Sequence, residues 1–146
     1  MSIFSSIDIS ATGMTAERTR MEIISKNIAN ANVNRTSSGE PYRRQMVVFK
    51  QNENTPFSTY LSKFAKERLN AKGVKISKIV EDMTPFKQIY EPGHPDADSN
   101  GYIQMPNVDI TTEMVDMISA ARAYEANMSS IDTSQNMALK ALEIGR

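Results

Sequence analysis

The last forty residues constrain the fold more than any other stretch, because apolar residues recur there at heptad spacing. Positions that average 3.5 residues apart stay on one side of a helix only where that helix packs along a partner. Neither Gly nor Pro occurs from Val108 to Ile144, which predicts a helix roughly 50 Å long at a rise of about 1.5 Å per residue. The predicted seam combines two series with steps of seven: Met114, Ala121, Met128, Gln135 and Leu142, and Ile110, Met117, Tyr124, Ile131 and Ala138.

The N-terminal segment, from Ser2 to about Ala31, is the predicted partner of that helix. Gly13 weakens its middle, since glycine lowers helix stability. Its apolar positions again step by seven, through Ile7, Met14, Met21 and Ile28. A chain with a middle segment returns most simply in the antiparallel direction. The predicted fold is therefore mainly α, with long N- and C-terminal helices forming an antiparallel coiled coil and a small β-rich middle segment.

The predicted domain organisation is discontinuous. Residues 1–34 and 107–146 form the terminal coiled-coil domain, and residues 35–106 form the β-rich and loop-rich middle segment. A variable insert is expected at about 51–73, where the spacing of apolar residues fits either a helix or a loop with anchoring aromatic side chains.

Two strands are predicted within the middle segment. Tyr42–Lys50 contains β-branched and aromatic residues and is bounded by turn residues. Val74–Val80 alternates as a strand with one buried face does, and we expect the two strands to pair. Lys87–Tyr90 is a candidate third strand. Glu91–Asn107 is predicted to be a loop, because prolines and glycines recur along it.

The formal net charge is zero, but the charges are unevenly distributed. Residues 41–90 carry ten Lys or Arg against four Asp or Glu, while residues 91–146 carry three against nine. Two interpretations remain open: each segment is simply solvated, or the basic middle of one subunit meets the acidic C-terminal part of another. A nucleic-acid partner is not predicted, since the basic residues lack aromatic interleaving or a known motif.

Membrane insertion and a cleaved signal peptide are not expected. No apolar run approaches the ~20 residues of a membrane span. The first fifteen residues have no basic region followed by a long apolar run. Cysteine is absent, which excludes disulfides and thiolate chemistry.

One stretch matches the first half of a calcium-binding loop, with Asp96, Asp98, Asn100 and Gly101 at the required spacing. The second half fails, because Asn107 stands where the loop needs a bidentate glutamate. A structural turn is therefore predicted in place of a metal site. A calcium-responsive coiled-coil adaptor remains the alternative function.

No constellation of residues suggests catalysis. His94 is the single histidine, and no serine or cysteine accompanies it in a triad arrangement. Glu81 and Asp82 are adjacent at a strand end, so their side chains point to opposite sides. An enzyme acting on the cell wall would need paired acids that the sequence lacks. We predict that the protein is not an enzyme and has no cofactor, metal or small-molecule substrate.

Two blocks of the sequence resemble the bacterial flagellar rod and hook family. Ile24–Asn32, Arg35-Thr36 and Tyr42–Gln45 resemble its N-terminal signature, whose residues here are Asn27, Asn30, Asn32, Thr36, Tyr42 and Arg43. The second block resembles the proximal-rod members and comprises Tyr90–Asp98, Gly101-Tyr102, Pro106–Asp109, Glu113–Asn127 and Lys140–Arg146. Residues 51–73 carry no motif of this family.

The resemblance implies a structural subunit of the flagellar basal body, exported without a cleaved signal. Such subunits would polymerise through their terminal helices into a hollow drive shaft that crosses the periplasm, transmits torque and conducts export substrates. The implied partners are copies of the chain, other proximal and distal rod subunits, the adaptor at the rod base and the flagellar type III export apparatus. The predicted seam would then be shared between the chain's own N-terminal helix and neighbouring subunits.

Overall fold

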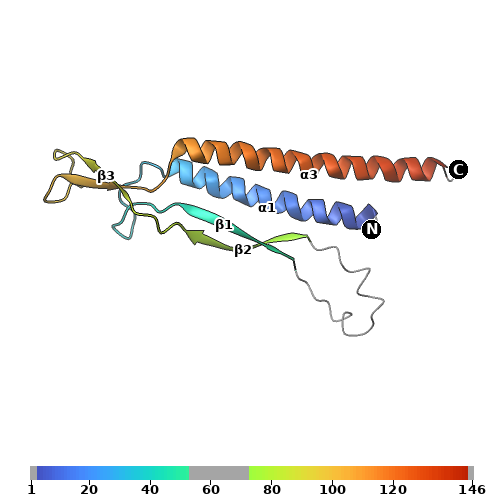
Figure 1. Cartoon of the computed structure of the whole chain (residues 1–146), viewed down its shortest axis with the longest axis horizontal. Helices are drawn as coiled ribbons and strands as arrows, with labels where there is room; N and C mark the ends of the chain where they lie inside the picture. The colour runs from blue at the N-terminus through green and yellow to red at the C-terminus, as the bar shows by residue number, and fades with distance from the viewer. Residues whose placement is uncertain (1–2, 53–72, 145–146) are drawn as a thin grey trace, which may run out of the picture.

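Two long helices and two β-hairpins make up the computed structural model, which describes residues 3–52 and 73–144 (Figure 1). The predicted terminal helices are confirmed. The elements are α1 (Ile3–Ala29), β1 (Gln45–Gln51), β2 (Val74–Glu81), β3 (Lys87–Tyr90), β4 (Tyr102–Met105) and α3 (Ile110–Ile144). Most of the insert expected at about 51–73 lies outside the described residues.

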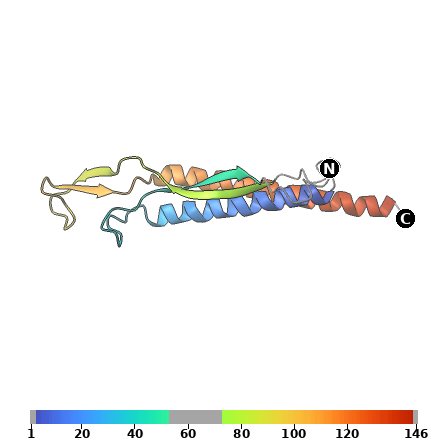
Figure 2. The ribbon, with the colours of Figure 1, turned by 90° about the horizontal axis from the view of Figure 1, so that it is seen from below.

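The two helices lie side by side in opposite directions (Figures 1 and 2). Ser10 meets Ser130 and Gly13 meets Asn127, so chain positions rise along α1 as they fall along α3. Because α3 is 35 residues long and α1 is 27, the last turns of α3 extend beyond the described start of α1. Asp109 caps α3, since its Oδ1 accepts hydrogen bonds from the Thr111 and Thr112 amides at 2.9 and 3.3 Å.

The β1–β2 hairpin is antiparallel and runs along α1 (Figure 1). The predicted strand pair is thus confirmed, with a register shift between Val48 and Phe49. The first strand begins three residues later than predicted, because Tyr42 is buried against the helices instead of extending the ladder. Alternation along β1 directs Val47 toward the helices, where it is half-buried.

The second hairpin, β3–β4, lies beyond the ends of the helices (Figure 1). The candidate strand at Lys87–Tyr90 is confirmed, but the prediction of an uninterrupted loop over Glu91–Asn107 was wrong in part. Ile103 supplies the physical reason, since pairing with β3 places this side chain in the interior with only 3% exposure. Gly101 permits the sharp turn before β4 by adopting a φ of +79°.

The apolar core is small and lies mainly where α1 ends and α3 begins. Ala31, Tyr42 and Val108 form its central cluster, and Val33 packs against them. Along the rest of the helix pair, few large apolar side chains are fully buried. None of the described helices is long and apolar enough to cross a membrane.

Candidate functional site

Small and polar side chains occupy the contact between α1 and α3. Glu113, Ala120 and Ser134 are the buried residues of α3, and they fall on one line with steps of seven or fourteen. A methyl group added to Gly13 would lie 2.9 Å from Oδ1 of Asn127, which shows how closely the helices approach. The inner contact is therefore tight but offers little apolar area.

The structure divides the predicted seam of α3 into two lines. One series is mostly half-buried beside α1: Met117, Tyr124, Ile131 and Ala138, with Ile110 exposed at the helix start. The other lies mostly at the surface: Met114, Met128, Gln135 and Leu142 are exposed, and Ala121 is half-buried. The buried residues Glu113, Ala120 and Ser134 each precede a member of this second series by one residue. One residue corresponds to a rotation of about 100° around the helix.

The predicted residues of α1, Ile7, Met14, Met21 and Ile28, are all half-buried. The remaining surface of α1 is polar, as at Arg18, whose guanidinium pairs with the Glu22 carboxylate at 3.1 Å. Large exposed apolar side chains are concentrated instead on α3. We define the outer face of α3 by Met114, Ile118, Met128, Leu139 and Leu142, which are 51–73% exposed. Several large apolar side chains exposed along one side of a helix mark a surface for association.

A buried polar cluster, here called the polar junction, fixes how the elements meet. It consists of Asn27, Tyr42, Arg44, Asn107 and Glu113. Glu113 is fully buried, and its carboxylate accepts hydrogen bonds from Arg44 Nε at 2.6 Å and Asn27 Nδ2 at 3.0 Å. Asn27 Oδ1 accepts a hydrogen bond from the Tyr42 hydroxyl at 2.9 Å. Each buried charge or amide thereby has a partner, as burial requires.

The polar junction connects α1, the residues before β1, the end of β2 and the start of α3. Asn107 Oδ1 accepts the Arg44 amide at 2.9 Å, and its Nδ2 donates to the Asp82 carbonyl at 3.0 Å. The Arg44 guanidinium also lies 3.3 Å from Asp116. These contacts tie the end of β2 and the residues before β1 to the first turn of α3. Together with Asn27 they set the rotation of α3 against α1.

The electrostatics of the junction follow from burial and ion pairing. Burial raises the pKa of the Tyr42 hydroxyl, and the carboxylates of Glu113 and Glu81 raise it further. Burial alone would lower the pKa of Arg44, but the Glu113 hydrogen bond and the charges of Glu113, Asp116 and Asp82 together outweigh it, so that pKa is raised. A hydrogen bond from the Thr84 amide lowers the pKa of Asp82. The junction thus combines a neutral tyrosine with a charged arginine.

The other predicted signature residues lie outside the junction. Asn30 Nδ2 donates to the Lys26 carbonyl at 2.7 Å and helps to end α1. Thr36 Oγ1 donates to the Glu40 carbonyl at 2.8 Å within the following turn, and Asn32 is exposed. Their roles in the described chain are local.

Arg43, another predicted residue, places its guanidinium 4.2 Å from the centre of the Phe86 ring. Sequence reasoning assigned no site role to Arg44, Asn107 or Glu113. The available signal in the sequence was the position of Glu113, which lies in the first turn of the predicted helix and in heptad register with Ala120 and Ser134. Its partner Arg44 is 69 positions away, so spacing did not reveal the pair.

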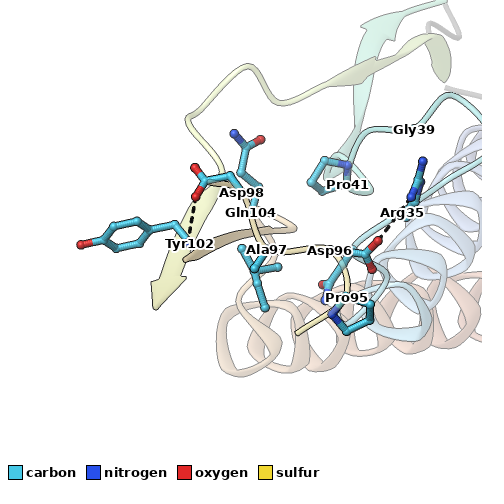
Figure 3. A pocket seen from close by; sticks show the side chains of 11 residues that line it. Arg35, Gly39, Pro41, Pro95, Asp96, Ala97, Asp98, Tyr102 and Gln104 are labelled. Carbon is cyan, nitrogen blue, oxygen red and sulfur yellow. Dashed lines mark hydrogen bonds and ion pairs between the residues drawn. The ribbon is translucent and has the colours of Figure 1, made fainter. Parts of the chain in front are cut away.

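Asp96 and Asp98, the carboxylates of the half calcium loop, make contacts within the protein (Figure 3). They border a cavity of about 330 Å³. Asp98 Oδ1 accepts the amides of Asn100 and Tyr102 at 2.8 and 3.0 Å, which closes the turn before β4. Asp96 lies 3.4 Å from Arg35. Within residues 3–52 and 73–144, no three acidic or histidine side chains converge in a metal-binding group.

Comparison with known proteins agrees with the sequence resemblance. Residues 7–35 match the family model described as flagella basal body rod protein, and residues 99–144 match the C-terminal model of flagellar basal body rod FlgEFG proteins. The flagellar basal-body rod protein FlgC of Borreliella burgdorferi is 44% identical, over 99% of this chain and 98% of its own length. FlgC of Bacillus subtilis is 44% identical and FlgC of Escherichia coli O6:H1 is 37% identical, each over the full length of both chains. The chain therefore belongs to the FlgC family of flagellar basal-body rod proteins.

Proposed function

We propose that the chain is a structural subunit of the flagellar basal-body rod and that it assembles through the outer face of α3. Family membership supports the rod assignment. The observation that supports this mode of assembly is the line of apolar residues of α3 that are exposed in the described part of the chain. In this proposal the side chains serve packing and have no catalytic role.

Assembly would supply the apolar burial that the single chain lacks. Full burial of a Met, Leu or Ile side chain contributes about 1.5–3 kcal/mol, so several such residues can stabilise one interface. The small core makes the chain depend on this gain, since binding only to the folded state raises its stability. The half-buried lines of α1 and α3 are proposed to form an antiparallel coiled coil inside each subunit.

The proposed neighbours are copies of the chain, other proximal and distal rod subunits and the adaptor at the rod base. The chain would reach this position in the periplasm through the flagellar type III export apparatus. Residues 1–34 and 107–146 would form the packing domain, and residues 35–106 the middle segment. The calcium adaptor is not favoured, because Asp98 and Asp96 are already engaged in the turn and with Arg35.

Met128→Asp tests the proposed outer face. Met128 is 51% exposed in the chain, so the isolated variant is expected to keep its helix content by circular dichroism. A charge buried without a partner is strongly unfavourable, so rod assembly and motility in soft agar are expected to be lost. Ser129→Asp, one position away and exposed, is the matched control and should retain motility. Full motility of Met128→Asp would overturn the assignment of this face.

A further inference from the structure

The β1–β2 hairpin has an outer face that is mainly basic. Val47 and Phe49 point inward, where they line a cavity with Ile23 and Ile24 of α1. Alternation and the observed register place the opposite set of side chains together on the other face. This outer hairpin face carries Val48, Lys50, Lys75 and Lys78, all of them exposed.

The lysines on this face are arranged in a way that favours an anionic neighbour. Lys50 is the direct cross-strand partner of Lys75, and Lys78 lies opposite Val48. Lys75 and Lys78 are exposed, so an acidic surface laid over them would be attracted to their charges.

The outer face of α3 offers the complementary pattern. Glu125 and Asp132 are exposed and lie one heptad apart, on the line that also holds Ile118 and Leu139. Their separation along the helix is about 10 Å at 1.5 Å per residue. Lys75 and Lys78 are separated by roughly 7–10 Å along their strand. The two faces thus carry charges at similar spacing and of opposite sign.

These two faces belong to different elements of one molecule. The hairpin packs on α1, and α3 also packs on α1, which lies between them (Figure 1). We propose that the outer hairpin face docks on the outer face of α3 of a second copy, with Lys75 and Lys78 opposite Glu125 and Asp132. The inference rests on the proposed rod function and names the surfaces that join neighbouring copies.

Cysteine cross-linking tests the contact directly, because the chain has no cysteine of its own. The full-length variant Lys78→Cys with Asp132→Cys is expressed in a flagellated host whose own copy of the protein has been deleted, and the purified basal bodies are oxidised. Disulfide-linked dimers and higher ladders are expected. The control pair Arg18→Cys with Asp132→Cys uses the polar surface of α1 and should not cross-link.

Charge reversal provides the second arm. Lys75→Glu with Lys78→Glu is expected to reduce incorporation into basal bodies by about tenfold or more, since like charges across an interface cost several kcal/mol. Adding Glu125→Lys with Asp132→Lys restores opposite signs in every copy and should restore incorporation. The control exchange, Arg18→Glu with Glu22→Lys, should have little effect. Circular dichroism of each purified variant excludes unfolding as the cause.

The outcomes separate this contact from the rod assignment. Normal motility after the lysine reversal, together with no cross-link, would overturn the contact while leaving the rod function intact. Loss of motility that the acidic exchange does not rescue, again without a cross-link, would mean that the lysines meet a different protein, and the inference would be wrong. Absence of the unaltered chain from basal bodies would instead refute the proposed function.

Discussion

Glu113→Ala is the perturbation that most severely tests the polar junction. The substitution removes two hydrogen bonds to a buried carboxylate, from Arg44 at 2.6 Å and Asn27 at 3.0 Å. Hydrogen bonds to charged groups contribute about 1.5–3 kcal/mol each. Part of the loss is offset, because Arg44 keeps Asp116 at 3.3 Å and Asn27 keeps the Gln45 carbonyl at 2.8 Å. We expect the free energy of unfolding to fall by about 3 kcal/mol, near the lower limit for breaking a buried ion pair.

Asp116→Ala is the matched control for this prediction. Asp116 contacts Arg44 and Arg20 at 3.3 and 3.5 Å, but its side chain is 34% exposed. An ion pair at such a site is expected to contribute less than about 1 kcal/mol. Urea unfolding of the two purified variants, followed by helical circular dichroism, gives both values. If the two variants differed by less than about 0.5 kcal/mol, the reasoning that assigns Glu113 the central role would be refuted.

Three further predictions concern the helix contact and its pH dependence. Because the pKa of Tyr42 is raised, its contribution to stability is complete below the ordinary tyrosine pKa of about 10 and is lost as pH rises through the folded-state pKa. Urea unfolding at a series of pH values should show this alkaline loss of stability, and Tyr42→Phe should reduce it. Gly13→Ala alone should hardly change the free energy of unfolding, because the gain in helix propensity is offset by displacement of the Asn127 side chain. In a chain that carries Asn127→Ala, the same substitution should stabilise by about 1 kcal/mol. If the effects of the two substitutions were additive, the close approach of α1 and α3 at Gly13 would be contradicted. Ile131→Asp, at a half-buried position, should lower the stability of the isolated chain by more than about 1 kcal/mol, and an unchanged unfolding curve would contradict its inward placement.

The helices could be predicted from sequence because their periodicity extends over many turns. A heptad pattern without Gly or Pro strongly favours the C-terminal helix. Alternation favoured a strand at Val74–Val80, and β-branched and aromatic residues bounded by turn residues favoured one at Tyr42–Lys50. The strand β4 was missed because it has four residues between Gly101 and Pro106, where turn signals dominate. Its strand character depends on pairing with β3 and on burial of Ile103.

The sequence pattern could not predict the rotation of α3 relative to α1, for a different reason. An apolar pattern identifies which positions favour burial, but it does not say whether the same chain or a neighbour buries them. The choice is made here by Glu113 and its partners Asn27 and Arg44, which come from distant parts of the chain. In this arrangement Met114 and Met128 are exposed.

Cysteine labelling of Met128→Cys measures most directly whether the outer face of α3 is the assembly surface. The introduced thiol is the sole cysteine of the chain, and its position is half exposed in the single molecule. A maleimide reagent should react readily with the isolated chain and at least about tenfold more slowly with the same chain in purified basal bodies, because packing excludes water and reagent from an interface core. Denaturing the basal bodies should restore the reaction. Equal labelling rates in the isolated chain and in intact basal bodies would contradict assembly through this face.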